Sequence, residues 1–205
     1  MATRLTYAYD DKYIAEFNAG YNGSEQFAPK NRYGFFPSAS AAWNISREKF
    51  FEKWTNVVDK MKLRVSYGLV GNDKIGNTRF LYLDNVARSY GGYSPSLSNN
   101  NTIQELFFGN PNLKWETAKK LNVGFELGLW KYFNLSFDIF SERRDNILIT
   151  KNSIPSIIGV ARSTIAPFNL GRVKNRGYEL EMSFNKTITK DLLIMAKANL
   201  NYKTV

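Results

Sequence analysis

The chain has 205 residues and contains 28 Lys and Arg against 18 Asp and Glu, for a formal net charge of +10, with no Cys and no His. These absences exclude disulfides, thiolate nucleophiles, histidine general bases, and zinc or iron sites built from Cys or His. No stretch approaches the 18 consecutive apolar residues of a transmembrane helix. Aromatic residues make up 15% of the chain, which favours β-structure.

Alternation of apolar and polar residues predicts four strands in the first part of the chain. Residues 5–21 read as a hairpin with its turn at 10–12. A third strand is expected at 35–45, where Pro37 predicts a bulge or an irregular start because proline cannot donate to a ladder. Residues 46–60 follow helical spacing, so we expect one short helix or helical turn capped by Ser46. Period-two alternation returns over 61–70.

The second part of the chain combines long polar segments with the clearest strand patterns. Residues 71–114 are rich in Asn, Ser and Gly, and a segment of this length is usually functional. Residues 80–83 are a candidate for an extra strand above the main sheet. Strands are predicted at 115–129, 133–149, 177–184 and 192–203, with short turns at 130–132 and 187–191 and a long loop at 150–172.

These elements predict an all-β protein, an antiparallel transmembrane β-barrel segment of about eight strands. Strands of roughly ten to fifteen residues exceed those of soluble sheets, and short and long connections alternate as in outer-membrane barrels. The short turns and residues 46–60 would lie on the periplasmic side. Charged residues on one face of the strands would line a watery lumen, and the candidates are Arg64, Lys120, Glu126, Asp138, Glu179 and Glu181.

Aromatic residues near the predicted strand ends fit the interfacial rows of a membrane barrel. They are Tyr21, Trp43, Trp115, Trp130, Tyr132, Tyr178 and Tyr202. A soluble antiparallel sandwich also has alternating strands, so the pattern alone leaves that alternative open. A self-contained eight-stranded barrel is a second alternative, and it would require the strand near Leu5 to pair with the strand near Leu200.

Candidate chemistry is sparse along the chain. Glu179 and Glu181 share a strand face about 7 Å apart, near the spacing of an inverting glycosidase, so a soluble carbohydrate-active domain is an alternative. We favour lumen-facing charges, because glycosidase carboxylates normally come from different strands. Asn72-Asp73 and Asp84-Asn85 offer oxygen ligands, but neither pair has the spacing of a calcium loop. We therefore predict no catalytic residue, no metal and no cofactor, and the chain is expected not to be an enzyme.

Two further features concern possible partners. The basic residues are scattered, with no run of five, so nucleic-acid binding is not expected, and contact with anionic lipopolysaccharide at the outer rim is favoured. Four aromatic residues of the long segment, Tyr90, Tyr93, Phe107 and Phe108, are candidates either for stacking on sugar rings or for packing the loop onto its neighbours.

Five segments, in this order, resemble the SusC/RagA-type TonB-dependent transporters of the Gram-negative outer membrane. They are RYGFFPSASAAWNIS (32–46), MKLRVSYGLVGNDKIGN (61–77), GNPNLKWETAKKLNVGFELGL (109–129), FDIFSERRDNILI (137–149) and NLGRVKNRGYELEM (169–182). Their order and spacing extend the resemblance over most of the chain, from residue 32 to residue 182.

The resemblance implies a fold and a role that composition does not. Family members have a signal peptide, a plug domain and a barrel of twenty-two strands, so residues 1–205 would be a central to late part of that barrel, without plug or signal peptide and not closed by itself. The implied function is import of oligosaccharides or peptides with energy from TonB. The implied partners are a SusD-like surface lipoprotein and, through the plug, TonB-ExbB-ExbD.

Overall fold

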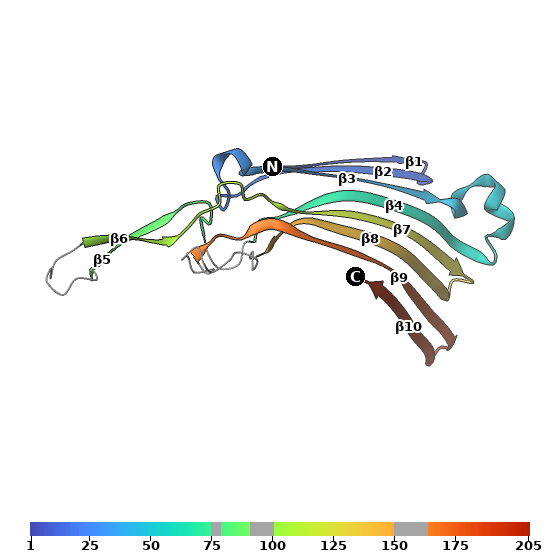
Figure 1. The fold of residues 1–205 in the computed structure, drawn as a ribbon. Helices are drawn as coiled ribbons and strands as arrows, with labels where there is room; N and C mark the ends of the chain where they lie inside the picture. The colour runs from blue at the N-terminus through green and yellow to red at the C-terminus, as the bar shows by residue number, and fades with distance from the viewer. Residues whose placement is uncertain (75–78, 91–100, 150–163) are drawn as a thin grey trace.

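The main element of the fold is one antiparallel sheet of eight strands (Figure 1). The computed structural model describes residues 1–74, 79–90, 101–149 and 164–205. The strands follow each other across the sheet in the order β1-β2-β3-β4-β7-β8-β9-β10. Their bounds are β1 (Ala2–Tyr9), β2 (Tyr13–Gly23), β3 (Tyr33–Asn44), β4 (Val58–Asn72), β7 (Glu116–Leu129), β8 (Phe133–Ile149), β9 (Phe168–Thr189) and β10 (Leu192–Thr204).

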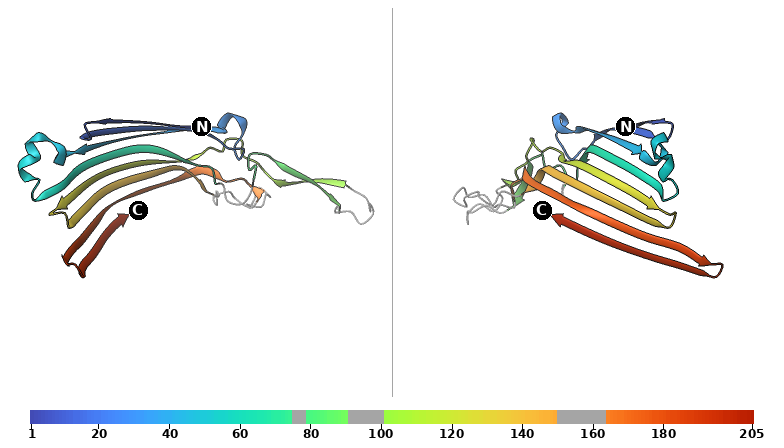
Figure 2. Two further views of the ribbon diagram at one scale, coloured as in Figure 1. Left: turned by 180° about the vertical axis from the view of Figure 1, so that it is seen from behind. Right: turned by 90° about the vertical axis from the view of Figure 1, so that its right-hand side faces the viewer.

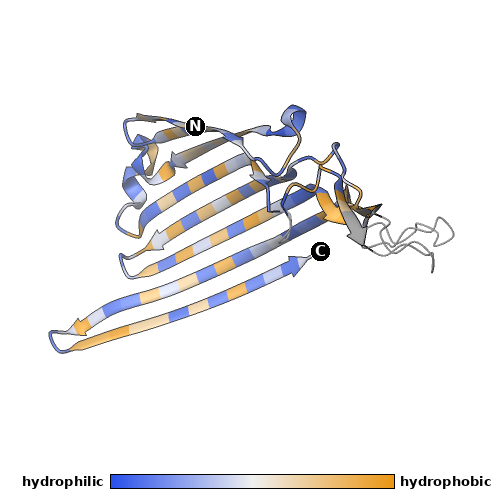
Figure 3. Cartoon of the chain, turned by 90° about the vertical axis from the view of Figure 1, so that its left-hand side faces the viewer, coloured by the Kyte–Doolittle hydropathy of each residue, from blue (hydrophilic) through white to orange (hydrophobic). Residues whose placement is uncertain are grey.

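The sheet is curved and open (Figure 2). β1 and β10 are its two edges and do not pair with each other, so the self-contained eight-stranded barrel is not what this chain forms. The predicted strands are confirmed, and β9 is longer than expected at 22 residues. Figure 3 shows the hydropathy of successive residues alternating along the strands, which is the pattern that directs side chains to opposite faces.

The short connections all lie at one end of the sheet. Two 3-10 helices, η2 (Ile45–Arg47) and η3 (Lys49–Trp54), join β3 to β4. The expected helical turn is therefore present, but the prediction that Ser46 caps it is wrong, because Ser46 lies inside η2 and neither helix has a side-chain cap. Among the described residues, no helix has both the length and the apolar character needed to cross a membrane.

The long connections lie at the other end. A third 3-10 helix, η1 (Pro29–Asn31), follows β2, and β5 (Asn85–Tyr90) pairs with β6 (Asn101–Phe107) in a separate two-stranded sheet that projects beyond the main one (Figures 1 and 2). The extra strand expected at 80–83 is wrong, since these residues form a turn with Leu83 N–H bonded to the Phe80 carbonyl. Phe80 has a positive φ of 56°, which ends extended structure there.

Pro37 does not produce the bulge that the sequence suggests. The β2–β3 register passes through the Ala19–Pro37 pair without a shift. On the other side of β3, pairing with β4 covers only Ser38–Asn44, so it begins at the residue that directly follows the proline. The missing N–H thus limits the length of one ladder rather than distorting the strand.

A small hydrophobic core lies among the long connections rather than under the sheet. Phe27 and Leu113 are fully buried and contact Leu81, which is 6% exposed. Trp115 stacks at a tilt on Phe27, with ring centroids 5.3 Å apart, and its indole N–H donates to the Arg32 carbonyl. This cluster joins three segments that are far apart in sequence and holds them against the end of the sheet.

A second anchor lies at the end with the short connections. The carboxylate of Glu48, between η2 and η3, accepts hydrogen bonds from Tyr13 Oη at 2.6 Å and Trp43 Nε1 at 3.0 Å. These two hydrogen bonds hold the pKa of Glu48 below its ordinary value of 4.5. They tie the β3–β4 connection to the first residues of β2 and the last of β3.

Truncating the loop cluster will loosen the long connections. Leu113→Ala removes a fully buried side chain and leaves a cavity, at a local cost of about 2 to 5 kcal/mol. We expect faster amide hydrogen exchange in residues 108–115 with little change in β7 and β8. Leu83→Ala is the matched control, because Leu83 is 53% exposed. Equal amide hydrogen-exchange rates in Leu113→Ala and Leu83→Ala would contradict the role of the cluster in holding the long connections.

The Glu48 anchor predicts a pH dependence. Because the pKa of Glu48 is lower in the folded state, its ionised form stabilises the connection above pH 4.5, and this contribution is lost as the pH falls through the folded value. Glu48→Gln should therefore lower the free energy of unfolding near neutral pH. It should also make that free energy decrease less steeply as the pH is lowered. Glu52→Gln, an exposed residue of η3, is the control. Chemical denaturation from pH 3 to pH 7 measures both.

Candidate functional site: the polar face of the sheet

The two faces of the main sheet differ in chemistry and in exposure. On the polar face the carboxylate side chains are partly covered, with Asp138 14% exposed and Glu126 21% exposed. On the opposite face large apolar residues are open, as at Ile139, which is 53% exposed. A sheet that curves toward its polar side produces this difference, because side chains crowd on the inside of the curve and spread on the outside.

An ion-pair ladder runs across the centre of the polar face. Arg64 on β4 donates from Nη2 to both carboxylate oxygens of Asp138 on β8, at 2.7 and 2.9 Å. Lys60 Nζ lies 2.6 Å from Glu126, and Arg64 Nε lies 3.6 Å from the same carboxylate. Ser136 adds a hydroxyl donor to Asp138 at 3.3 Å. Two basic and two acidic side chains thus form one cluster on the polar face of the sheet.

Gly124 makes the central pair possible. In the register Gly124 of β7 lies between Arg64 and Asp138, so the two charges must meet over an intervening strand. A Cβ at this position would come within 2.4 Å of Arg64 Nε and 2.6 Å of Asp138 Oδ1. Nothing in the sequence alone distinguishes Gly124 from the other glycines of the chain. What marks Gly124 is its place between charged residues of the neighbouring strands on the polar face. This pattern can be recognised only once the strand register is known.

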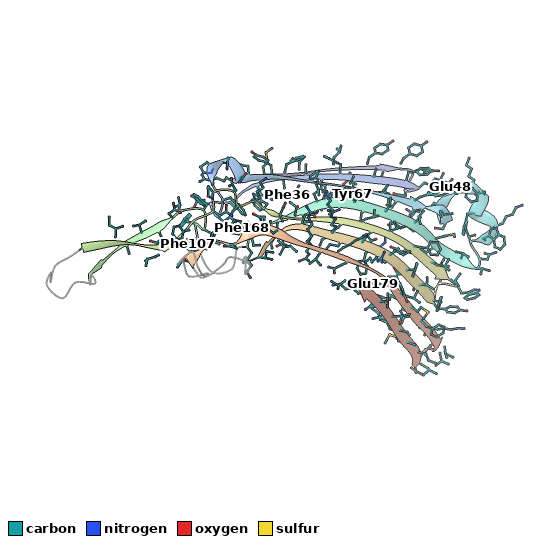
Figure 4. The ribbon with its side chains drawn as sticks, in the orientation of Figure 1. Phe36, Glu48, Tyr67, Phe107, Phe168 and Glu179 are labelled. Atoms are coloured by element: carbon teal, nitrogen blue, oxygen red, sulfur yellow. The ribbon has the colours of Figure 1, made fainter. Side chains whose placement is uncertain are left out.

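A second group of charges lies nearer the long connections. Glu142 pairs with Lys120 at 3.9 Å and with Arg144, and Arg144 also approaches Glu116 at 3.8 Å. On β9 and β10, Glu181 lies 2.7 Å from Lys197. Glu179, which is labelled in Figure 4, lies on β9. It is opposite Asp138 in the register and makes no ion pair with any described residue. Most charges on this face are therefore compensated.

Two polar grooves accompany these charges. The larger, of about 580 Å³, is lined by residues of β2, β3, β4, β7, β8 and β9, including Glu16, Lys62 and Arg64. A smaller one of about 290 Å³ lies between Arg64, Asp138, Glu179 and Asn201. Serine and asparagine side chains line both grooves beside the ions. The face therefore offers hydrogen-bond donors and acceptors to a polar solute without a large local net charge.

The opposite face has the features of a membrane surface. Exposed apolar residues from every strand lie on it, among them Leu5 at 68% and Tyr67 at 53% exposure. Among the described residues no second sheet covers it, so a soluble sandwich, which would bury such a face, does not account for the structure. An exposed apolar surface of this extent marks contact with a membrane or a partner.

Two rows of aromatic residues border this apolar face. Near the short connections Tyr13 stacks on Trp43 and Trp130 on Tyr132. Toward the long connections the stacked pairs are Tyr21 with Tyr33 and Tyr178 with Tyr202, each with ring centroids 5.4 Å apart. The expectation for Trp115 is wrong, because its ring packs into the loop cluster against Phe27 and Phe36. Tyr178 lies within β9 rather than at its end.

The loop aromatics named from the sequence have different positions. Phe107 packs against the Phe27, Leu81 and Leu113 cluster (Figure 4). Phe108 is half-buried, and its backbone exchanges hydrogen bonds with Thr164 and Ala166. The side chain of Tyr90 and the whole of Tyr93 lie outside the described residues. The structure therefore brings Phe107 and Phe108 together with neighbouring loops and leaves their contact with a solute a prediction.

An apolar outer face bordered by aromatic rows and a polar inner face define a segment of a membrane-spanning β-barrel wall. The chain matches the family described as TonB dependent receptor-like, beta-barrel, over residues 3–204. It is 34% identical over 189 residues to TonB-dependent receptor P3 of Formosa agariphila, covering 92% of this chain and 18% of the receptor. Over 190 residues it is 30% identical to TonB-dependent receptor SusC of Bacteroides thetaiotaomicron, with the same coverage.

Solved structures show the same fold. The RagAB peptide importer in its open-open state matches with a TM-score of 0.84 and 26% sequence identity, over 98% of this chain and 21% of that one. This chain belongs to the SusC/RagA-type TonB-dependent receptors, whose members are bacterial outer-membrane proteins. It spans about a fifth of the length of the relatives it matches. The short connections are accordingly periplasmic and the long ones extracellular.

Filling the space over Gly124 will disrupt the central ion pair. Gly124→Ala places a methyl group against both Arg64 and Asp138, and we expect about 1 to 3 kcal/mol of destabilisation. Gly20→Ala is the matched control on the same face, since its nearest contacts would be ordinary at 3.7 Å. Urea unfolding of the parent barrel in micelles compares the two. The explanation fails if Gly20→Ala costs as much as Gly124→Ala.

Proposed function

We propose that this chain forms part of the wall of an outer-membrane transporter that imports oligosaccharides or peptides with energy supplied through TonB. The observation that carries the proposal is a polar, largely charge-compensated inner face on a membrane barrel wall. Paired charges and neighbouring Ser and Asn groups suit solutes that carry many hydrogen-bonding groups and little net charge. Oligosaccharides and peptides both fit that description.

The relatives support the same class of activity. One similar structure is titled as a peptide importer, and a curated relative is the receptor SusC. Relatives are named as receptors or transporters, in agreement with a wall that performs no bond-making step. Glu179 and Glu181, the carboxylates of the glycosidase alternative, lie on the open inner wall, and Glu181 is engaged by Lys197 at 2.7 Å. Hydrolysis by this pair has no further support.

The partners follow from the proposed transport cycle. A SusD-like surface lipoprotein would cover the extracellular end, where the long connections lie. A plug domain encoded elsewhere in the parent protein would fill the lumen and contact TonB, which works with ExbB and ExbD. Lipopolysaccharide would surround the outer rim. We place the parent protein in the outer membrane of a Gram-negative bacterium.

Uptake by cells tests the proposal directly. Deleting the gene that encodes this chain should abolish uptake of at least one fluorescent oligosaccharide or peptide from a panel, and a plasmid copy should restore it. A protonophore should reduce restored uptake to the level of the deletion strain, because TonB draws on the proton gradient. Undiminished uptake in the deletion strain would contradict the proposed transport role. Uptake that resists the protonophore would contradict the proposed coupling to TonB.

The partner requires a separate measurement. Affinity purification of the tagged parent protein from membranes should recover a surface lipoprotein in near-equal amount. Solubilised membranes from a strain that expresses the parent protein without the tag provide the control. Recovery of the barrel alone under mild detergent would contradict the proposed lid.

A further inference from the structure

A group of basic side chains lies on the outward face of the sheet, where the rest of the surface is apolar or aromatic. Lys119 on β7, Arg143 on β8 and Lys174 on β9 are direct cross-strand neighbours, and Arg176 lies two residues beyond Lys174 on the same strand. We call these four residues the outer basic row. They share the face of Leu121, Ile139 and Tyr178, because each lies an even number of residues from them along its strand.

The row carries charge that the chain itself does not neutralise. Arg143 pairs with Asp145 at 3.1 Å, and Arg172 also approaches that carboxylate at 3.6 Å. Lys119, Lys174 and Arg176 are exposed and make no ion pair or hydrogen bond with any described residue. Like charges directly opposite one another across strands are destabilising. An external anion that bridges them would remove this repulsion.

The height of the row on the barrel wall identifies the surroundings. Directly below the outer basic row, toward the periplasmic end, lie Tyr178 and Tyr202, which belong to the aromatic row near the long connections. From Tyr178 to Phe184 the outward positions of β9 are apolar or aromatic over about 20 Å of strand, close to the height of a barrel's lipid-facing band. Arg176 and Lys174 therefore lie just above the hydrocarbon, at the level of the headgroups of the extracellular leaflet.

The geometry points to a site for the phosphate groups of an outer-leaflet lipid, formed by Lys119, Arg143, Lys174 and Arg176. The acyl chains of this lipid would lie along the apolar face below the site, while its phosphate oxygens bridge the basic side chains of three strands. Lysine and arginine are the residues that bind phosphate, and their attraction to an anionic membrane surface is additive over several residues. The inference rests on the outer-membrane placement of the proposed function and not on transport.

The position on the outer face separates this site from the solute path. The inner ion pairs, such as Arg64 of β4 with Asp138 of β8, lie on the opposite face of the sheet. A solute moving through the lumen does not meet the outer basic row. A lipid bound there would contact β7, β8 and β9 together and so hold the wall where its long connections begin.

Lipid binding by the purified parent protein tests the site. The probe is bisphosphorylated lipid A, compared with phosphatidylcholine, with dissociation constants from native mass spectrometry in a fixed detergent. The triple variant Lys119→Gln, Lys174→Gln and Arg176→Gln should bind lipid A about 100-fold more weakly, since each basic residue contributes about fivefold. Lys174→Gln alone should show about a fivefold loss, which keeps the test valid if the triple variant fails to fold.

A matched control removes equal charge from the other end of the sheet. Lys49→Gln, Lys53→Gln and Lys190→Gln alter three exposed lysines near the short connections and should leave lipid A binding unchanged. Equal affinity for lipid A and phosphatidylcholine, or equal loss in the control and the triple variant, would overturn the site. Full competition by inorganic phosphate would also overturn it as a lipid site. Transport can fail in the deletion experiment without affecting any of these outcomes.

Discussion

Backbone hydrogen bonding within lipid is the constraint on which the rest of this structure depends. A strand that crosses hydrocarbon must pair its N–H and C=O groups with neighbouring strands, because no water is available there. Each of the eight strands is joined to its neighbours by such a ladder, in chain order and without crossovers. β1 and β10 are edges in this chain, and edges of this kind are costly in lipid unless other strands pair with them.

The ladder has a direct consequence for side-chain chemistry. Fixed register places residues of three or four strands in line, so a charge can be compensated by a partner from a distant part of the sequence. Arg64 and Asp138 are 74 positions apart and meet over Gly124. On the outer face the same registers align Lys119, Arg143 and Lys174, and of these only Arg143 has an acidic partner among the described residues, Asp145. One face is neutralised internally, and the other turns its charge toward the membrane surface.

The chain holds its connections with polar and aromatic anchors at one end and a hydrophobic cluster at the other. Glu48 binds the periplasmic connection through Tyr13 and Trp43. Phe27, Leu81 and Leu113 join the extracellular segments above the barrel wall. Both anchors lie outside the lipid-facing band, so the loops are positioned without a conventional core beneath the sheet. This arrangement leaves the inner face free for polar groups and the outer face free for lipid.

Alternation along the sequence was sufficient to predict eight strands, their faces and the side on which each connection lies, because period two is a local property of each segment. Other features do not follow from alternation: the local Ser46 cap and Pro37 bulge are absent, and contacts between distant segments lie beyond any local pattern. Its position near a strand end predicts an interfacial place for Trp115, but its indole packs with Phe27 and Phe36. The single extra strand expected at 80–83 is a turn, and the two-stranded sheet is formed instead by β5 and β6, whose alternation is weak. The sequence by itself determined a two-faced membrane wall, since facing follows from the identity of alternate residues. Only the tertiary structure decided which charges meet, since strand register is set by the pairing of whole strands and not by any one of them.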